Sequence, residues 1–246
     1  HPIVTNHAID KIEDRADAFF IMDGSTYDAS IQTAINDIKV VDSNYVGTYY
    51  PWVKIVDSGT SLPVWVPPSV VLPGVISYND QVAHEWFAPA GFNRGALDFV
   101  RNINTRLSAQ DRDTLYDNRI NPIANFPNGG FVIFGQKTLQ MAKSALDRVN
   151  VRRMLLEVKR LIVGVANRIL FEQNTPATRA RFVAQTTPLL ALVQAQAGIE
   201  QFRVICDDTN NTPDVIDRNE FLADIFIKPA RSINFIGLTF VATRTG

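Results

Sequence analysis

The sequence holds a single cysteine, Cys206, so no disulfide bond can form within the chain. Its three histidines, His1, His7 and His84, are not spaced as a metal-binding pair. Acidic and basic residues nearly balance, 25 against 24, which leaves no overall field to attract nucleic acid or anionic lipid. No run of about 18 apolar residues occurs, so we expect no membrane-spanning helix.

What is present is an ordinary apolar content of 46% in 246 residues, enough for one large domain or two ordinary ones. The first residues, HPIVTNHAIDKIEDR, lack an initiator Met and do not have the pattern of a signal peptide. We therefore expect the chain to be part of a longer protein.

The beginning of the chain predicts a parallel α/β layer. Residues 16–22, ADAFFIM, form an apolar run that predicts a buried strand, and YVGTYYPWVKIVD (45–57) predicts a second one. Between them, Asp28 is expected to open a helix with one apolar face, made by Ile31, Ala34, Ile35 and Ile38. This β-α-β order favours parallel strands. Pro67-Pro68 then predicts a helix start, and Pro73 is expected to shorten or kink that helix.

The segment 88–97, APAGFNRGAL, is rich in Gly and Pro and is our predicted domain boundary. The fold class that follows is mixed: a partial α/β domain in residues 1–87, then an α+β domain in residues 88–246. In the second domain, paired helices are expected to pack on a small mixed or antiparallel sheet.

The second domain carries the strongest helical signal, from about Val149 to Phe171. Before it, Ser108 is expected to cap a short helix, and INPIANFPNGG and FVIFG (120–135) predict extended segments. After it, Thr175 is expected to cap a helix that ends near Gly198. Three strands are expected to follow, at residues 202–206, 221–229 and 232–243.

Two segments resemble catalytic motifs, but neither has the residue spacing that its motif requires. In GFVIFGQKT (130–138), Gln136 separates Gly135 from Lys137, which breaks the spacing of a phosphate-binding loop. In FFIMDGST (19–26), Asp23 follows an apolar strand as in phosphatases with an Asp nucleophile, but Ser25 stands where the second Asp is needed. The residues therefore provide no evident catalytic set, and we expect no catalytic residue.

The acidic segment CDDTNNTPDVIDRNE (206–220) suggests calcium binding, but it has no glycine, and Pro213 and Asn219 occupy key positions of the EF-hand pattern. Cys206 ends an apolar strand without a nearby histidine, which favours a buried structural cysteine. We expect no metal or cofactor. The polar side chains are predicted to stabilise a turn through hydrogen bonds to nearby backbone groups. An alternative prediction is that the carboxylates face a basic patch on a neighbouring subunit. They are Asp207, Asp208, Asn210, Asn211, Asp214 and Asp217.

Eight segments, taken in order, resemble the C-terminal half of contractile-tail sheath proteins, most closely those of T-even-like bacteriophages. They are WVPPSVVLPGVISYND, APAGFNRGAL, LYDNRINPI, GFVIFGQKT, DRVNVRRMLLEVK, LFEQNTPATRARF, CDDTNNTPDVIDRNEF and IKPARSINFIGLTFVATRTG. The resemblance runs from about Trp65 to Gly246, and residues 1–64 fit the preceding sheath domain more loosely.

The resemblance implies a structural subunit that is not an enzyme and has no cofactor. Such subunits stack as hexameric rings around the tail tube and contract to drive the tube through the host envelope for genome ejection. The implied partners are other copies, the tail tube protein, and the baseplate and tail terminator proteins, with no direct nucleic-acid contact and no membrane insertion. The implied location is the virion tail, after assembly in the host cytoplasm. The alternatives are a sheath of a bacterial contractile injection machine and, from another class, an α/β hydrolase or phosphatase fragment.

Two site hypotheses accompany the resemblance. The apolar segment 232–243 is expected to exchange strands with neighbouring subunits, through Ile233, Phe235, Ile236, Leu238, Phe240 and Val241. A charged helix face is expected to contact the tube or an adjacent subunit, through Arg152, Arg153, Glu157 and Arg160, with Arg153 and Glu157 at the i,i+4 pairing distance.

Overall fold

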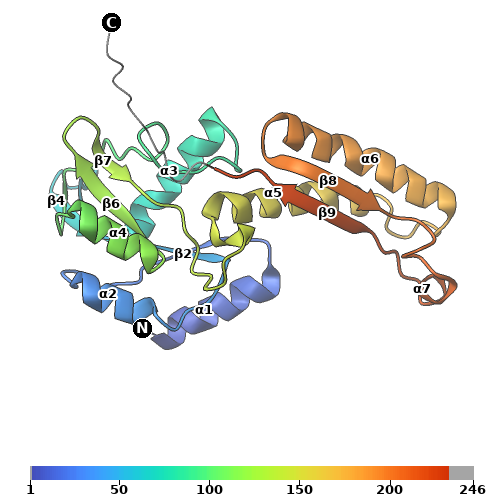
Figure 1. The fold of residues 1–246 in the computed structure, drawn as a ribbon, viewed down its shortest axis with the longest axis horizontal. Helices are drawn as coiled ribbons and strands as arrows, with labels where there is room; N and C mark the ends of the chain where they lie inside the picture. The colour runs from blue at the N-terminus through green and yellow to red at the C-terminus, as the bar shows by residue number, and fades with distance from the viewer. Residues whose placement is uncertain (1, 233–246) are drawn as a thin grey trace, which may run out of the picture.

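The structure of the protein, a computed structural model, describes residues 2–232. Figure 1 shows a mixed α/β body, coloured blue to green, from which a long lobe, coloured yellow to red, extends to one side. No helix within residues 2–232 combines the length and the hydropathy that a bilayer crossing requires.

The body is built on a four-stranded sheet in the order β1-β2-β6-β7. β1 (Phe20–Met22), β2 (Val46–Tyr50) and β6 (Ile120–Phe126) are parallel, and β7 (Gly130–Ile133) runs antiparallel to β6. The parallel pairing of β1 with β2 confirms the β-α-β prediction. A smaller antiparallel sheet has the order β4-β3-β5 and consists of β3 (Val53–Val56), β4 (Pro63–Val66) and β5 (Asn102–Ile103).

Helices cover both faces of the four-stranded sheet (Figure 1). Against one face, a core cluster joins residues of α1 (Pro2–Arg15), α2 (Ile31–Ile38) and α4 (Ala109–Asp117) to β1, β2 and β6. Against the other face, a second cluster joins α3 (Pro68–Val82) to β2, β6 and β7. β2 contributes to both, since Val46 and Tyr50 belong to the first cluster and Tyr49 to the second. This alternation is the period-two pattern of a strand buried on both sides.

Two of the predictions for the body are wrong in detail. The segment 45–57 is not one strand: β2 and β3 belong to different sheets and are separated by Pro51, which has no N–H to donate to a ladder. Asp28 does not open α2. It has a left-handed φ of 61°, and the cap is Ser30, whose hydroxyl accepts the Thr33 N–H at 3.1 Å.

The helix predicted at Pro67-Pro68 begins at Pro68 and runs for 15 residues with Pro73 inside it, so it is not short. The predicted boundary segment 88–97 lies between α3 and β5, and Ala96 forms a bridge with Val132 of β7. Strands from both sides of residue 87 pair in the four-stranded sheet, which therefore continues across the predicted boundary.

Within residues 2–232 the lobe contains two long helices and a two-stranded antiparallel sheet. The paired helices and the antiparallel pairing were predicted, and all but the first residue of the third predicted strand, 232–243, lies outside the described residues. Thr175 caps the second helix through the Thr178 N–H, also as predicted. Side chains of both helices and both strands form its core around Met154, Val158 and Leu190. The elements are the short 3-10 helix η1 (Ala145–Asp147), α5 (Val149–Ala166), α6 (Pro176–Ala195), β8 (Ile199–Ile205), α7 (Pro213–Asp217) and β9 (Asp224–Pro229).

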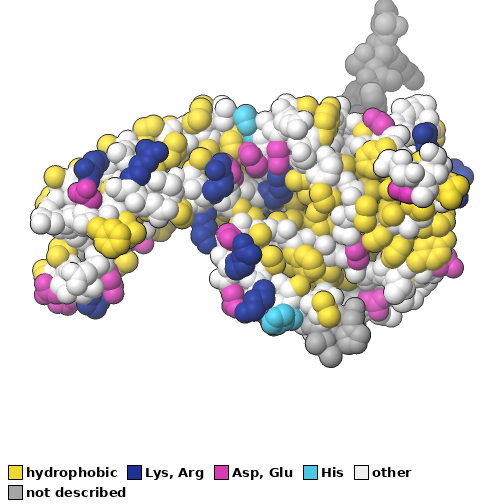
Figure 2. All heavy atoms as spheres, turned by 180° about the vertical axis from the view of Figure 1, so that it is seen from behind, with side chains coloured by type: hydrophobic (Ala, Val, Ile, Leu, Met, Phe, Trp, Pro, Cys, Tyr) yellow, Lys and Arg dark blue, Asp and Glu magenta, His cyan; other side chains and the backbone are white. Residues whose placement is uncertain are grey.

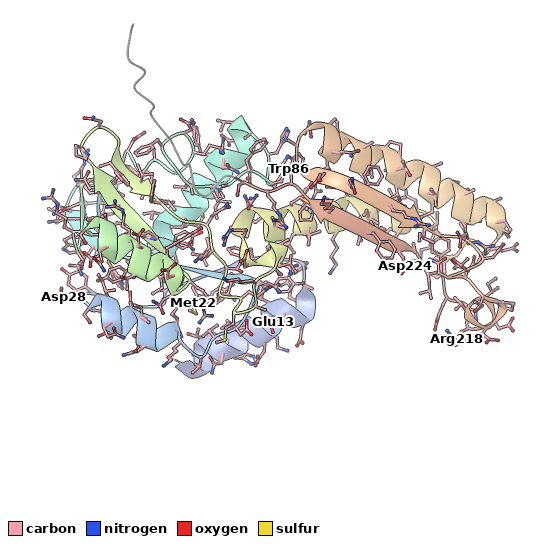
Figure 3. The ribbon with its side chains drawn as sticks, in the orientation of Figure 1. Glu13, Met22, Asp28, Trp86, Arg218 and Asp224 are labelled. Atoms are coloured by element: carbon pink, nitrogen blue, oxygen red, sulfur yellow. The ribbon has the colours of Figure 1, made fainter. Side chains whose placement is uncertain are left out.

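Trp86 lies where the lobe joins the body (Figure 3). Its indole N–H donates to the Gln196 carbonyl at 2.9 Å, and its own carbonyl accepts from the Asn150 side chain at 3.1 Å. Gly198 packs so closely that a Cβ there would lie 2.8 Å from the indole ring. Trp86 thus ties the segment after α3 to the start of α5 and to the turn between α6 and β8.

Candidate functional site

The charged side chains of α5 do not form the continuous exposed face that the sequence predicts. Arg152 is 7% exposed; its guanidinium stacks on the Tyr45 ring at 4.0 Å and donates to the Asn44 side chain. Burial lowers the pKa of Arg152. Glu157 pairs with Arg160, and only the Arg160 side chain, 71% exposed, is free to meet another molecule.

The predicted Arg153–Glu157 pair is also wrong. Arg153 instead pairs with Asp80 of α3 at 2.6 Å and donates to the Glu85 carbonyl at 3.3 Å. The Arg153 side chain is only 10% exposed in this ion pair. The pair is therefore better shielded from solvent than a pair on the exposed surface of the helix would be. The pair ties α5 of the lobe to α3 of the body.

Replacing Asp80 with alanine is expected to lower the free energy of unfolding by about 1–3 kcal/mol, because the largely covered Arg153 guanidinium loses its charged acceptor. A double-mutant cycle with Arg153→Met, measured by denaturant unfolding, should give a coupling of about 1 kcal/mol between residues 80 and 153. The matched cycle between Arg153 and Glu157 should give a coupling near zero. A larger coupling with Glu157 than with Asp80 would contradict the tertiary pairing.

In the acidic segment 206–220 after β8, Asp and Asn side chains accept hydrogen bonds from backbone N–H groups close by in sequence, as is usual in turns. Asp207 accepts the Thr209 N–H at 2.9 Å, and Asn210 accepts the Asp207 N–H at 3.0 Å. Asn211 is buried, donates to the Leu222 carbonyl at 2.7 Å and accepts the Leu222 N–H at 3.0 Å. Asp208 instead pairs with the buried Arg179. Two further acids of the segment, Asp214 and Asp217, lie in α7.

Cys206 is buried, and burial raises the pKa of its thiol, which disfavours the thiolate that a nucleophile needs. Its sulfur lies near Asn211 and the Leu222 carbonyl, contacts that suit a structural side chain. Within residues 2–232, no group of three His, Cys, Asp or Glu side chains is arranged to hold a metal ion.

The loop after β7 is tied to the sheet and does not form a phosphate cradle. The Lys137 N–H donates to the buried Asn121 side chain at 2.6 Å, and the Lys137 ammonium donates to the Tyr116 carbonyl at 2.6 Å. The same ammonium lies 4.1 Å from the Tyr116 ring centroid. Asp23, the other catalytic candidate, accepts the Ser69 N–H at 3.1 Å. Its carboxylate therefore satisfies a backbone N–H in the first turn of α3, which has no acceptor within the helix.

A basic pocket of about 1010 Å³ lies where the lobe begins, and sequence reasoning missed it. Its walls come from the end of α4, the segment between β7 and α5, and the end of β9. Five cationic side chains line it against the carboxylates of Asp117 and Asp147; they are Arg119, Lys137, Lys143, Arg148 and Arg231. Three separate stretches of chain supply these cations, so no local pattern signals the pocket.

The β8–β9 hairpin offers two sheet edges. Within residues 2–232 it pairs with no third strand, so the outer edges of both strands stay unpaired there. Its inner face carries Phe202, Val204, Ile225 and Ile227 and packs on the α5–α6 core, while Phe226 on the other face is 58% exposed. The predicted strand-exchange residues, Ile233 to Val241, lie outside the described residues.

This fold, an α/β body with a helical lobe that carries a small sheet, is similar to solved structures of contractile sheaths. The structure is similar to that of the anti-feeding prophage helical sheath in the contracted state, with a TM-score of 0.79 and 25% identity, covering 95% of this chain and 64% of that chain.

The chain belongs to the phage tail sheath family. Residues 3–139 match the family model of the phage tail sheath protein central domain, and residues 142–243 match that of the phage tail sheath C-terminal domain. The chain is 44% identical to the tail sheath protein of Vibrio phage KVP40 over 84% of its length, and 43% identical to that of Enterobacteria phage T4 over 74%. It spans 30% and 28% of those proteins.

Membership confirms the resemblance to T-even-like sheath proteins. The relatives are structural tail sheath proteins, which gives no support to the hydrolase or phosphatase interpretation. The two family models meet near residue 140, between β7 and η1, which is where the lobe begins.

Proposed function

We propose that this chain is the part of a contractile phage tail sheath subunit that links neighbouring copies into stacked hexameric rings around the tail tube. The observation that carries the proposal is the β8–β9 hairpin, whose outer edges are unpaired within residues 2–232, at one side of a chain of the phage tail sheath family. An extended segment from another copy can add to such an edge by backbone hydrogen bonds.

The architecture suits an assembly that changes its lattice. A helical array needs heterologous contacts, made by different patches of each subunit. Backbone pairing at a hairpin edge survives rotation of the attached bodies, so a strand link persists while other contacts exchange. On this proposal the lattice stores the energy of contraction, which drives the tube through the host envelope for genome ejection.

The remaining partners belong to the same proposal. They are the tail tube protein, the baseplate and the tail terminator, with assembly in the host cytoplasm before the subunit joins the virion tail. Of the predicted α5 contact face, Arg160 is the residue we propose for contact with the tube or an adjacent subunit, because its side chain is well exposed, while Glu157 holds it through their ion pair. The likeness to the anti-feeding prophage sheath favours a second candidate, a sheath of a bacterial contractile injection machine. Phage structural genes next to the coding gene would favour the phage sheath.

Electron microscopy of the complete gene product tests the function. Ribbed tubes or stacked rings are the expected result, and monodisperse particles under all assembly conditions would overturn it. Leu238→Lys, within the apolar segment 232–243 that we propose for strand exchange, is expected to abolish tubes by placing a charge in that segment. Leu62→Lys makes the same chemical change at a side chain that is already 62% exposed and should leave tubes intact. Tubes formed normally by the Leu238→Lys variant would argue against strand exchange at that residue.

A further inference from the structure

The outer end of the lobe is strongly acidic. Figure 2 shows Asp and Glu side chains, in magenta, gathered there, and Figure 3 places Asp224 at the same end, far from Trp86. We define the acidic end as Asp207, Asp208, Asp214, Asp217, Glu220 and Asp224, all of them exposed. Between residues 207 and 224 the only basic residue is Arg218.

Most of these carboxylates form no ion pair within the described residues. Asp208 pairs with Arg179 and Glu220 with Arg218. The other four carboxylates make no ion pair within residues 2–232. Hydrogen bonds from Thr209 lower the pKa of Asp207, so its charge persists in mildly acidic solution.

In the basic pocket, by contrast, most of the positively charged side chains form no ion pair within the described residues. Arg119 donates to the carbonyls of Val41, Leu139 and Lys39, and its guanidinium has no carboxylate partner within the described residues. Lys143 and Arg231 are exposed and form no ion pair there either. Only Arg148 is paired, with Asp147 at 3.4 Å.

A buried polar group in the wall of the pocket is also unsatisfied. Asn150 is 5% exposed and lines the pocket, and its side-chain oxygen has no hydrogen-bond partner in the described part of the chain. A buried acceptor without a donor costs free energy unless an incoming group supplies one. A backbone N–H of an entering polypeptide is such a donor.

The acidic end and the basic pocket lie at opposite ends of the lobe. Asn150 and Val151 of the pocket belong to the first turn of α5, which has 18 residues and so spans about 27 Å toward the outer end. The acidic end follows β8 at that far end, as Figure 1 shows for α7. Within one copy the two patches are therefore held apart by the lobe itself.

We propose that the acidic end of one copy docks into the basic pocket of a neighbouring copy. The inference rests on the proposed sheath function and names a contact within that assembly. Opposite charges on two different patches give a heterologous, head-to-tail contact, which is the kind that an open helical array requires. Because the unpaired charges are exposed, the contact is sensitive to ionic strength over the usual screening range.

A charge swap in the complete gene product tests the pairing. Asp214→Lys with Asp217→Lys reverses two acids whose side chains make no hydrogen bond or ion pair within the described residues. Lys143→Glu with Arg231→Glu reverses two exposed pocket cations that likewise form no ion pair within the described residues. Each double variant is expected to raise the protein concentration needed for assembly about tenfold or more, measured by sedimentation and electron microscopy. Combining all four changes in one chain should restore assembly.

The matched control is Asp10→Lys with Glu13→Lys, which reverses two exposed acids at the same i,i+3 spacing on α1 and should assemble normally. Normal assembly of either test variant, or no recovery when all four changes are combined, would overturn the docking. Wild-type chains that never form tubes or rings would overturn the sheath function itself, so the two failures are distinguishable.

Chemical crosslinking tests proximity without relying on charge. Wild-type Cys206 is buried, 6% exposed, and gives little background. Chains with Asp217→Cys and Lys143→Cys, assembled and treated with a short bismaleimide, should give a ladder of covalent multimers. Pairing Asp217→Cys with Glu13→Cys should not. A ladder from the control pair alone would contradict the proposed contact.

Discussion

Replacement of Trp86 by alanine is expected to lower the free energy of unfolding by about 3–5 kcal/mol and to loosen the lobe from the body. The side chain is 8% exposed and lies in the lobe core with Val151, Met154 and Leu190. Its removal leaves a large cavity and deprives the Gln196 carbonyl of its indole donor. Gly198, which packs against the ring, loses that contact as well.

Denaturant unfolding measures the loss of stability, and amide hydrogen exchange around residues 196–198 reports whether the junction opens locally. Trp65→Ala is the control, since Trp65 is a partly exposed residue of β4 in the small sheet. Equal losses of stability for the two variants, without faster exchange near Gly198, would show that Trp86 is not what holds the junction.

Replacement of Asn121 by alanine is expected to cost about 2–4 kcal/mol, because it leaves several buried backbone groups without partners at once. The Asn121 side chain is fully buried, donates to the Thr48 and Lys137 carbonyls at 3.0 and 2.8 Å, and accepts the Lys137 N–H. It therefore joins β2, β6 and the loop that follows β7. Without it, that loop loses its attachment to the sheet.

Asn125→Ala provides the comparison for Asn121→Ala. Asn125 lies on the same strand, β6, but its side chain is exposed. Its loss is expected to change the free energy of unfolding by less than about 0.5 kcal/mol. Thermal and denaturant unfolding measure both variants. A similar small effect at Asn121 would mean that water replaces its hydrogen bonds and that the loop is not anchored through this amide.

Elements whose signals are local were predictable. Ser108 caps α4 with a full capping box, and Thr175 caps α6, because a cap depends on residues three positions apart. The apolar spacing of α5 predicts its buried side, where Val151, Met154 and Val158 lie. Turn chemistry also predicts that Asn210 and Asn211 bond to nearby backbone, and their amides donate to the Ile205 and Asp207 carbonyls.

Elements that depend on distant partners were not predictable. Arg153 has a suitable acid four residues along the helix but pairs with Asp80, which is 73 positions away in sequence. The Gly- and Pro-rich segment 88–97 suggests a boundary, but β6 returns to pair with β2 and carries the sheet across it. Spacing within one element carries no information about which surfaces that element meets.

The sequence by itself determined the sheath family, the long helices α5 and α6, the caps at Ser108 and Thr175 and the polar turn after β8, because each rests on motifs or on residues close along the chain. Only the tertiary structure decided the sheet order, the Trp86 junction and the separation of an acidic end from a basic pocket. The pocket cations come from residues 119, 137–148 and 231, and folding alone brings them together. Electrostatic complementarity depends on distances in space, and those distances are set by the packing of the whole chain.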